Sequence, residues 1–351
     1  MDIKKFLGEA VITGASDMFV VAGLPVKYKI GGSFTTRNEE VLLPEATAAL
    51  IGQVYEEAGR KLDINSYRDD DFSVTIPGLS RFRVNVYRQR GSLAMVVRVI
   101  RFALPNPEKI GIPQTVMELA DRRKGLVLVT GTAGSGKSTT LACFVDRVNS
   151  TRQEHIVTLE DPLEYMHKHK KSIISQREIS TDTDSYLTAL RASLRQAPDV
   201  IMLGEMRDHE TISVAMTAAE TGHLVFSSLH TVSASSTMDR VIDVFPANQQ
   251  SQVRTQLALV LQAVVSQQLV PGINGGAVPA FEIMIANNAI RNLIRESKLH
   301  QIDSIIHSSS QEGMTTMDSS LASLYKQGLI SKDSALVHSP NPDLLAKRLE
   351  A

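Results

Sequence analysis

Cysteine, tryptophan and long apolar runs are scarce or missing in this chain of 351 residues. Its single cysteine, Cys143, excludes an intramolecular disulfide framework and a cysteine-ligated metal cluster. The N-terminus lacks the apolar stretch of a signal peptide, and no segment approaches the roughly 20 apolar residues that a membrane-spanning helix needs. We therefore expect a cytoplasmic protein without a transmembrane segment.

An excess of charge of either sign is also missing. Lys and Arg number 37 and Asp and Glu number 38, so the formal net charge is −1. Proteins that bind nucleic acid usually carry a basic excess, so we expect no nucleic acid partner. Aromatic residues make up 5% of the chain and hydrophobic residues 43%, which is typical of an aliphatic α/β core.

Residues 1–103 have the pattern of a compact α+β domain. Polar and apolar residues alternate strictly in Arg81–Tyr87, which predicts a strand with one buried face. Further elements are predicted as one helix and two strands, at 45–62, 72–76 and 93–100. Residues 104–113 contain three prolines and a glycine, so they are predicted to link this domain to the rest of the chain.

Residues 114–351 alternate between short apolar runs and helical patterns. Runs typical of buried strands lie at 126–130, 155–159 and 200–203, and this arrangement predicts a mostly parallel sheet with helices on both faces. An amphipathic helix is predicted at 251–269, and helices are expected from about residue 285 to the C-terminus.

A complete phosphate-binding loop occupies residues 131–138. The run Gly-x4-Gly-Lys-Ser follows a predicted strand and opens a predicted helix, which is the context that this motif requires. Glycines let backbone N–H groups turn toward phosphates, and the helix N-terminus adds partial positive charge. We expect Lys137 to reach the β- and γ-phosphates, Ser138 to bind Mg²⁺ and Thr139 to lie near the α-phosphate. The predicted nucleotide contacts are Gly131, Thr132, Ala133, Gly134, Ser135, Gly136, Lys137, Ser138 and Thr139.

Carboxylates follow two of the predicted strands. Glu205 comes after Val200–Leu203, where many phosphate-loop enzymes have an Asp and this chain has Gly204. We predict that Glu205 is the catalytic base that polarises the attacking water. Glu160 and Asp161 follow another strand, and two carboxylates at a sheet edge repel each other unless a cation lies between them. We therefore predict a catalytic role for Glu160 and a Mg²⁺ contact, partly through water, for Asp161.

Two histidines flank the apolar run Leu224–Leu229. An imidazole N–H can donate to a phosphate oxygen in either protonation state. We predict that His230 takes part in catalysis and that His223 contacts the nucleotide, with the γ-phosphate as the group sensed. The alternative is that each is an ordinary histidine beside an apolar strand.

These segments together resemble the type II/type IV secretion ATPases. The loop, the acidic segment, Leu203–Asp208 and the histidine segment occur in the order of that family. Outside this core, Ala15–Met18 resembles the family's Ser-Asp signature and Arg81–Asn85 its arginine strand. Ala289–Glu296 resembles the signature of the branch that retracts pili. The resemblance covers nearly the whole chain.

The resemblance implies an N-terminal PAS-like domain, a RecA-like ATPase domain with a C-terminal helical extension, and a ring-shaped homohexamer. It implies ATP and Mg²⁺ as cofactors and the retraction of type IV pili, which drives twitching motility, at the cytoplasmic face of the inner membrane. The implied partners are an inner-membrane platform protein and a second retraction or extension ATPase. Arg81, Arg83 and Arg98 are implied to approach the phosphates from the same or a neighbouring subunit, where an arginine stabilises transition-state charge. The alternative for each is a solvated charge on a strand face.

The retraction-type segment contains two like charges four residues apart, Arg291 and Arg295. On a helix this spacing costs a few tenths of a kcal/mol. We expect a partner or a carboxylate to offset this cost, with Glu296 contributing in part.

Three other functions stay open on the sequence. A pilus-extension or type II secretion ATPase shares the loop, although such chains often have a longer N-terminal region and cysteine metal clusters. A RecA-like nucleic-acid motor is the second, and it needs a basic surface whose affinity for nucleic acid falls as the salt concentration rises. A regulator that hydrolyses ATP slowly is the third, because Ala277 stands where the family usually has Arg; Phe281 stands where it usually has His.

Overall fold

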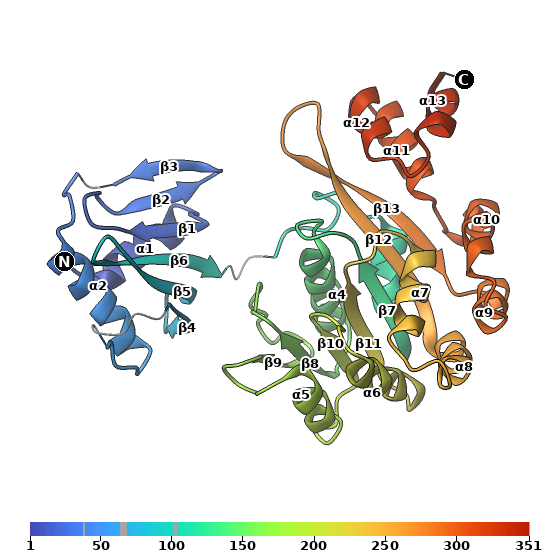
Figure 1. The fold of residues 1–351 in the computed structure, drawn as a ribbon, viewed down its shortest axis with the longest axis horizontal. Coiled ribbons are helices and arrows are strands. Elements are labelled where there is room, and N and C mark those ends of the chain that lie inside the picture. Colours follow the sequence, from blue (N-terminus) through green and yellow to red (C-terminus); the bar gives the residue numbers. More distant parts are fainter. Residues whose placement is uncertain (38, 64–68, 101–103, 351) are drawn as a thin grey trace. The chain divides into compact units, whose positions relative to one another are not determined.

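The computed structural model describes residues 1–37, 39–63, 69–100 and 104–350, and the chain divides into two compact units. The N-terminal unit comprises Met1–Ala103 and Glu164–Met166, and the C-terminal unit comprises Leu104–Leu163 and His167–Ala351. The proline-rich residues 104–113 thus belong to the C-terminal unit. Figure 1 shows the elements of each unit.

The N-terminal unit is built on a six-stranded antiparallel sheet in the order β3-β2-β1-β6-β5-β4. Its elements are α1 (Ile3–Ile12), β1 (Asp17–Val20), β2 (Lys27–Ile30), β3 (Ser33–Thr36), α2 (Pro44–Glu57), β4 (Asp70–Ile76), β5 (Ser80–Gln89) and β6 (Ser92–Ile100). The alternation predicted for β5 is confirmed, because Phe82, Val84 and Val86 are buried. These side chains share a core with Leu50, Ile51 and Val54 of α2, so helices cover one face of the sheet.

The C-terminal unit is built on a seven-stranded sheet in the order β13-β12-β7-β11-β10-β8-β9. The strands are β7 (Gly125–Thr130), β8 (His155–Glu160), β9 (Ile173–Glu178), β10 (Val200–Leu203), β11 (Leu224–Leu229), β12 (Leu261–Pro271) and β13 (Ala277–Ile285). All neighbouring pairs are parallel except β12 with β13, which form an antiparallel pair.

Helices cover both faces of this sheet, and the central strand β7 contributes to two separate cores. Leu126 and Leu128 pack with residues of α5 to α10, whereas Val127 and Val129 pack with residues of α3 and α4. This burial on both faces explains why β7 reads as an unbroken apolar run. The helices are α3 (Gln114–Met117), η1 (Glu118–Asp121), α4 (Lys137–Thr151), α5 (Tyr186–Ser193), α6 (His209–Glu220), α7 (Ala234–Asp243), α8 (Gln250–Val260), α9 (Asn288–Arg295), η2 (Leu299–Gln301), α10 (Ile302–Ser308), η3 (Ser310–Glu312), α11 (Met317–Lys326), α12 (Lys332–Val337) and α13 (Pro342–Glu350).

The helix predicted at 251–269 is wrong in its second half. The helix α8 ends at Val260, and Leu261 begins β12, which pairs with β7 in parallel. The apolar residues at 260–265 are compatible with a helical stripe and also with a strand that is buried on both faces. The segment forms a strand because the edge of β7 offers backbone hydrogen bonds. The strand β13 is not among the predicted strands; it ends at Ile285, where the helical region is expected to begin, and it covers the outer edge of β12.

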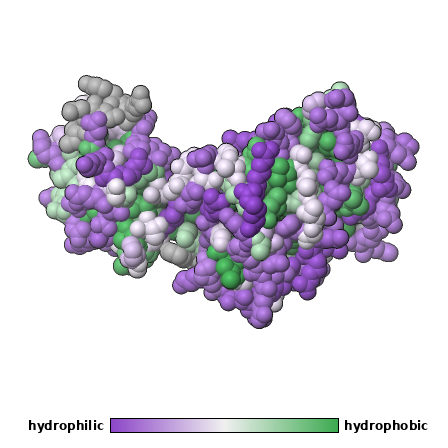
Figure 2. Space-filling view, turned by 90° about the horizontal axis from the view of Figure 1, so that it is seen from below, coloured by the Kyte–Doolittle hydropathy of each residue, from purple (hydrophilic) through white to green (hydrophobic). Residues whose placement is uncertain are grey.

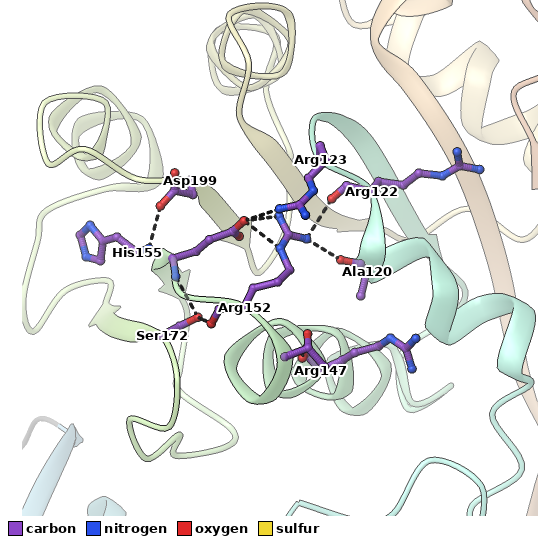
Figure 3. A network of polar contacts seen from close by, with 10 residues as sticks. Ala120, Arg122, Arg123, Arg147, Arg152, His155, Ser172 and Asp199 are labelled. Atoms are coloured by element: carbon purple, nitrogen blue, oxygen red, sulfur yellow. Dashed lines mark hydrogen bonds and ion pairs between the residues drawn. The ribbon is translucent and has the colours of Figure 1, made fainter.

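A buried ion pair ties the start of β8 to the loop before β7, at the edge where the parallel strands begin. Figure 3 shows Arg152 directed toward the backbone of Ala120 and Arg122. Its Nη1 atom donates to both carbonyl oxygens at 3.0 Å, and its Nη2 atom lies 2.6 Å from Glu154 Oε1. The exposed fractions of the two side chains are only 11% and 12%. Arg123 reaches the same carboxylate oxygen at 3.4 Å, although its side chain is 80% exposed.

The surface of the molecule is mainly hydrophilic on the face drawn in Figure 2, with hydrophobic residues in smaller areas among the polar ones. Large apolar side chains that are exposed, such as Ile173, Leu259 and Leu344, come from separate elements. Within the residues that the structure describes, no helix combines the length and apolar character needed to cross a bilayer.

Arg152 and Arg123 both contact Glu154, but only Arg152 is largely buried, so the two allow a matched test of how burial affects the stability that each contact contributes. Arg152→Ala leaves a buried carboxylate without its partner, so we expect a loss of about 3 kcal/mol in the unfolding free energy of the C-terminal unit. Arg123→Ala removes an exposed contact and is expected to cost less than about 1 kcal/mol. Thermal denaturation of both variants checks this, and equal melting temperatures would contradict it.

Candidate active site

The phosphate loop joins β7 to α4 at the edge where the parallel strands end. The register pairs Thr130 with Leu229, Ser227 with Leu203, and Leu203 with Leu159, so β7, β11, β10 and β8 all finish near the loop. We call this the phosphate-loop edge. Ligands of open α/β sheets bind beyond the carboxyl ends of the strands, and the predicted loop occupies that position.

Glycine is required at both ends of the loop for steric reasons. Gly131 and Gly136 have φ angles of 146° and 92°, which other residues rarely adopt. A Cβ atom on Gly131 would lie 2.2 Å from the carbonyl oxygen of Gln267, and one on Gly136 would lie 2.7 Å from Gln267 Nε2. Gly134 also has a positive φ angle, 77°, but a Cβ atom there would meet nothing within 4 Å.

The loop is held in a shape that fits a chain of phosphates. Lys137 is buried, and its Nζ atom donates to the carbonyl oxygens of Gly131 at 2.8 Å and Thr132 at 2.9 Å. The ammonium group is therefore placed across the mouth of the loop. The Oγ atom of Ser135 is buried and has no hydrogen-bond partner among the described residues. A buried ammonium group and a buried unsatisfied hydroxyl group are what a polyanionic ligand requires.

The two acidic residues after β8 lie in different environments. Glu160 is buried, and its Oε1 atom accepts hydrogen bonds from Thr158 Oγ1 at 2.7 Å and Gln176 Nε2 at 3.3 Å. Asp161 is exposed at the phosphate-loop edge. A buried hydrogen-bonded carboxylate is suited to holding its neighbours in place, whereas the exposed carboxylate is the more accessible to a hydrated cation.

Glu205 lies between an arginine and a histidine, just beyond β10. Its Oε1 atom is 2.5 Å from Arg207 Nη2, and its Oε2 atom is 3.4 Å from His230 Nε2. The side chain is 12% exposed, and within the described residues Oε2 accepts no hydrogen bond. The carboxylate holds Arg207 in its charged form, which raises the pKa of this guanidinium group. One oxygen of Glu205 is thus engaged, while the other is placed to accept a proton.

A tyrosine that the sequence did not reveal completes this group of carboxylates. Burial raises the pKa of the Tyr186 hydroxyl, and the charges of Glu205, Asp161 and Glu160 raise it further. The hydroxyl group therefore stays protonated and can donate within the cluster. A Cβ atom on Gly204 would lie 2.7 Å from Tyr186 Oη, which explains the glycine between β10 and Glu205. No motif marked Tyr186, because it lies outside the phosphate loop and the acidic and histidine segments and is brought to the site by the packing of α5.

The structure brings His230 to the site but not His223. His230 follows β11 at the phosphate-loop edge and lies near Glu205. His223 precedes β11 at the opposite edge, where its carbonyl oxygen accepts from Gly125 N and its Nδ1 atom lies 2.9 Å from the carbonyl oxygen of Ala218. A strand of this length separates the two imidazoles by roughly 20 Å. Within one protomer, His223 is therefore not positioned beside the phosphate loop, contrary to our expectation for a nucleotide contact.

The three candidate arginines share one face of the N-terminal sheet. Arg83 and Arg98 are cross-strand partners in β5 and β6, and Arg81 is two residues from Arg83. Arg83 forms a bidentate ion pair with Asp71, with an Nη2–Oδ2 distance of 2.6 Å, and Arg98 Nε lies 3.0 Å from Asp17 Oδ1. Arg81 Nη1 donates to Thr75 Oγ1 at 3.3 Å. Their role toward phosphates stays a prediction.

The side chains near the loop suit Mg²⁺, which needs few protein ligands, better than a metal ion that is coordinated by protein side chains alone. No cluster of three or more His, Cys, Asp or Glu side chains suited to a metal occurs in the described parts of the chain. Mg²⁺ usually takes only one or two protein ligands together with phosphate oxygens and waters. Ser138 at the start of α4 and the exposed carboxylate of Asp161 match that small donor set.

The two arginines of α9 have different surroundings. Arg291 donates from Nη1 to the carbonyl oxygens of Ala258 and Leu259, the latter at 2.9 Å, and from Nη2 to that of Leu261 at 2.8 Å. These carbonyl groups end α8, so Arg291 caps its C-terminus. Burial, then Arg295, lowers the pKa of Arg291. The expected partner that offsets the like charges is thus in part the chain's own backbone, and the exposed side chain of Arg295 donates to Asn292 Oδ1.

The two departures from the family pattern lie on β13. Ala277 is exposed at the turn of the β12–β13 hairpin, where it pairs with Pro271. Phe281 is buried and packs in the core that also contains Val129 and Phe144. Phe281 thus packs in the core where the family has a polar side chain. Ala277 lies opposite Pro271, which is four residues beyond Gln267 on β12.

Known proteins resemble this chain along nearly its whole length. A family model described as type II/IV secretion system protein matches residues 1–324. The type IV pilus retraction ATPase PilT of Pseudomonas aeruginosa is 45% identical over 98% of this chain and 99% of its own. A twitching motility protein of Neisseria gonorrhoeae is 45% identical over 87% of this chain and 82% of its own. A crystal structure of the pilus retraction motor PilT with bound ADP superposes with a TM-score of 0.88, at 46% identity and 99% coverage of both chains.

The glycines of the loop provide a matched test of the site. Gly131→Ala places a methyl group against a backbone carbonyl that cannot move, so we expect nucleotide binding to be lost. Gly134→Ala introduces only backbone strain, about 1 kcal/mol, and is expected to weaken binding by no more than about tenfold. Titration with MgADP checks both variants, with circular dichroism to confirm folding. Binding by Gly131→Ala at wild-type affinity would contradict the steric argument.

Proposed function

The chain belongs to the type II/IV secretion system protein family, and we propose that it is the ATP-driven motor that retracts type IV pili. The observation that carries this proposal is its end-to-end similarity to a pilus retraction ATPase. The predicted family and the α/β fold, with an N-terminal domain, a RecA-like ATPase domain and C-terminal helices, are confirmed. The chain is an ATP hydrolase, since it combines this fold with a complete phosphate loop.

The chemistry follows from the arrangement at the phosphate-loop edge. Bound ATP supplies the phosphoanhydride bond that is cleaved, and Mg²⁺ supplies positive charge at its phosphates. Lys137 and the backbone N–H groups of the loop hold the phosphate oxygens, and Ser138 and Asp161 hold the cation. Glu205 takes the proton of the attacking water on its free Oε2 atom. His230, at 3.4 Å from that atom, orients the same water and the oxygens of the terminal phosphate.

The ion pair with Arg207 gives Glu205 two states, one with the arginine bound and one with the arginine released. The guanidinium group binds Oε1 at 2.5 Å and is mostly exposed, so it can leave the carboxylate without unfolding its surroundings. While it is bound, its positive charge lies 2.5 Å from Oε1. Release of Arg207 toward the phosphates would add positive charge near the transition state.

The assembly proposed here is a homohexamer at the cytoplasmic face of the inner membrane. It acts on an inner-membrane platform protein, and a second retraction or extension ATPase is a further partner. Arg81, Arg83 and Arg98 are the proposed contributors of positive charge from the N-terminal unit. Ion pairs of Arg83 with Asp71 and of Arg98 with Asp17 restrain these two side chains on one sheet face, which lowers the entropy cost of presenting them.

The other functions are less favoured. A secretion or extension ATPase would not explain a match to a retraction ATPase that covers 99% of that relative. A nucleic-acid motor is disfavoured by the net charge of −1. The slow regulator rests on Ala277, and steady-state phosphate release by the wild-type protein distinguishes it from the motor.

The role of Glu205 is tested by Glu205→Gln. The amide keeps the shape and the contact with Arg207 but cannot accept a proton, so we expect kcat to fall at least about 100-fold while the affinity for MgATP is retained. Steady-state phosphate release and a binding titration measure the two effects. Turnover within about threefold of wild type would remove Glu205 as the base.

The signature helix α9 is tested by separating its two arginines. Arg295→Ala is expected to abolish twitching in a strain that lacks its own retraction ATPase, with ATPase activity retained. Arg291→Ala removes the cap of α8 and is expected to cost about 2 kcal/mol of stability, since it breaks hydrogen bonds from a charged donor. Lys332→Ala on α12 is the control for loss of a surface cation. Normal twitching of Arg295→Ala would exclude α9 from the mechanism.

A further inference from the structure

Gln267 of β12 lies directly against the phosphate loop, although it belongs to none of the motifs that define the site. Its side chain is buried, with only 5% of the residue exposed. The backbone pairing of β12 with β7 ends at Ser266 and Thr130, and the hydroxyl groups of these two residues are 2.9 Å apart. Gln267 is therefore the first residue of β12 beyond the end of β7, at the level where the loop begins.

Gln267 contacts the loop at three points. Its carbonyl oxygen lies 2.2 Å from the point where a Cβ atom of Gly131 would be, and its Nε2 atom lies 2.7 Å from the corresponding point of Gly136. Its Oε1 atom accepts a hydrogen bond from Thr140 Oγ1 at 2.8 Å, in the first turn of α4. One residue thus contacts the start of the loop, its end and the helix that follows it.

The hydrogen bond also fixes which way the amide faces. The Thr140 hydroxyl donates to Oε1, so Nε2 is directed toward Gly136. Both glycines have left-handed φ angles, and a loop of this kind keeps its curvature only while its two ends are held at a fixed separation. The backbone carbonyl of Gln267 lies against the first of these glycines and its planar amide against the second, so one residue holds both ends. The N–H groups of the loop are aimed at phosphate only in that curved shape.

We propose that Gln267 is a positioning residue for the nucleotide: it sets the curvature of the phosphate loop and thereby the affinity for the phosphate chain. This inference rests on the proposed function only in that the loop binds nucleotide. Gln267 acts through the loop rather than by touching the reacting atoms, so its loss weakens binding more than it slows cleavage.

The experiment uses Gln267→Met, Thr140→Val and the double variant in the full-length protein. Methionine keeps the length without the amide, and valine removes the same hydrogen bond from the other side without changing side-chain shape. We expect each single variant to bind MgADP about 5- to 10-fold more weakly in calorimetric titration, and the double variant to be no weaker than the weaker single one. The KM for MgATP should rise by the same factor while kcat changes by less than about threefold.

The matched control is Gln268→Met, one residue further along the strand. The Nε2 atom of Gln268 donates to the carbonyl oxygen of His338 at 2.9 Å, away from the loop. This variant loses a partly buried, hydrogen-bonded amide of the neighbouring residue, so a general weakening of β12 would affect it too. We expect its affinity for MgADP to equal that of the wild type.

The outcomes separate this inference from the assignment of the site. A wild-type protein that binds no MgADP would overturn the proposed function itself. Wild-type affinity in both Gln267→Met and Thr140→Val, additive losses in the double variant, or an equal loss in Gln268→Met would overturn the positioning role while leaving the function intact. If Gln267→Met fails to fold, Thr140→Val alone decides, because it removes the same hydrogen bond from the helix side.

Discussion

In the C-terminal unit, β7, β11, β10 and β8 run parallel and in register, so their carboxyl ends meet at one edge of the sheet. Every catalytic feature of this unit depends on that alignment. The phosphate loop follows β7, Glu160 ends β8, Glu205 follows β10 and His230 follows β11. Residues up to about a hundred positions apart in the sequence therefore become neighbours at this edge. A shift of β10 against β11 by one residue would move Glu205 away from His230 and reverse the side-chain faces of the strand.

The two edges of the parallel sheet serve different purposes. The phosphate-loop edge gathers the carboxylates of Glu160, Asp161 and Glu205, whose charges together raise the pKa of Tyr186. Such a cluster destabilises the folded chain unless cations or bound ligands offset it. At the opposite edge, buried Arg152 is satisfied by Glu154 and by backbone carbonyl groups. The carboxylates of the phosphate-loop edge thus lie where a cation or ligand can bind, while an ion pair and backbone hydrogen bonds hold the other edge.

The β12–β13 hairpin connects the nucleotide site with the C-terminal helices. Gln267 contacts the loop, and Gln268 bonds to the residue that ends α12. Glu282 on β13 accepts from Ala234 N at 2.8 Å, at the start of α7, and burial raises its pKa to about 7. At the other end of β12, Arg291 of α9 bonds to the carbonyl oxygen of Leu261. One hairpin therefore touches the phosphate loop, the helix that follows His230, and the signature helix, which is the arrangement that a motor requires to convert hydrolysis into movement.

The sequence by itself determined the phosphate loop, the strands β5, β7, β8 and β10, and the acidic residues that follow two of them. These features are local: glycine spacing, apolar runs and strand ends are written in consecutive residues. Tertiary structure alone decided the rest. The apolar stretch after Val260 became a strand because β7 had a free edge, and Gln267 and Tyr186 reached the site because β12 and α5 pack there. His223 and His230 look equivalent in sequence, yet a strand separates them, since the direction of β11 places only the second at the loop. Arg291 and Arg295 likewise differ only because the end of α8 lies beside one of them. Periodicity reports which residues are buried, whereas strand order and register decide which neighbours they meet.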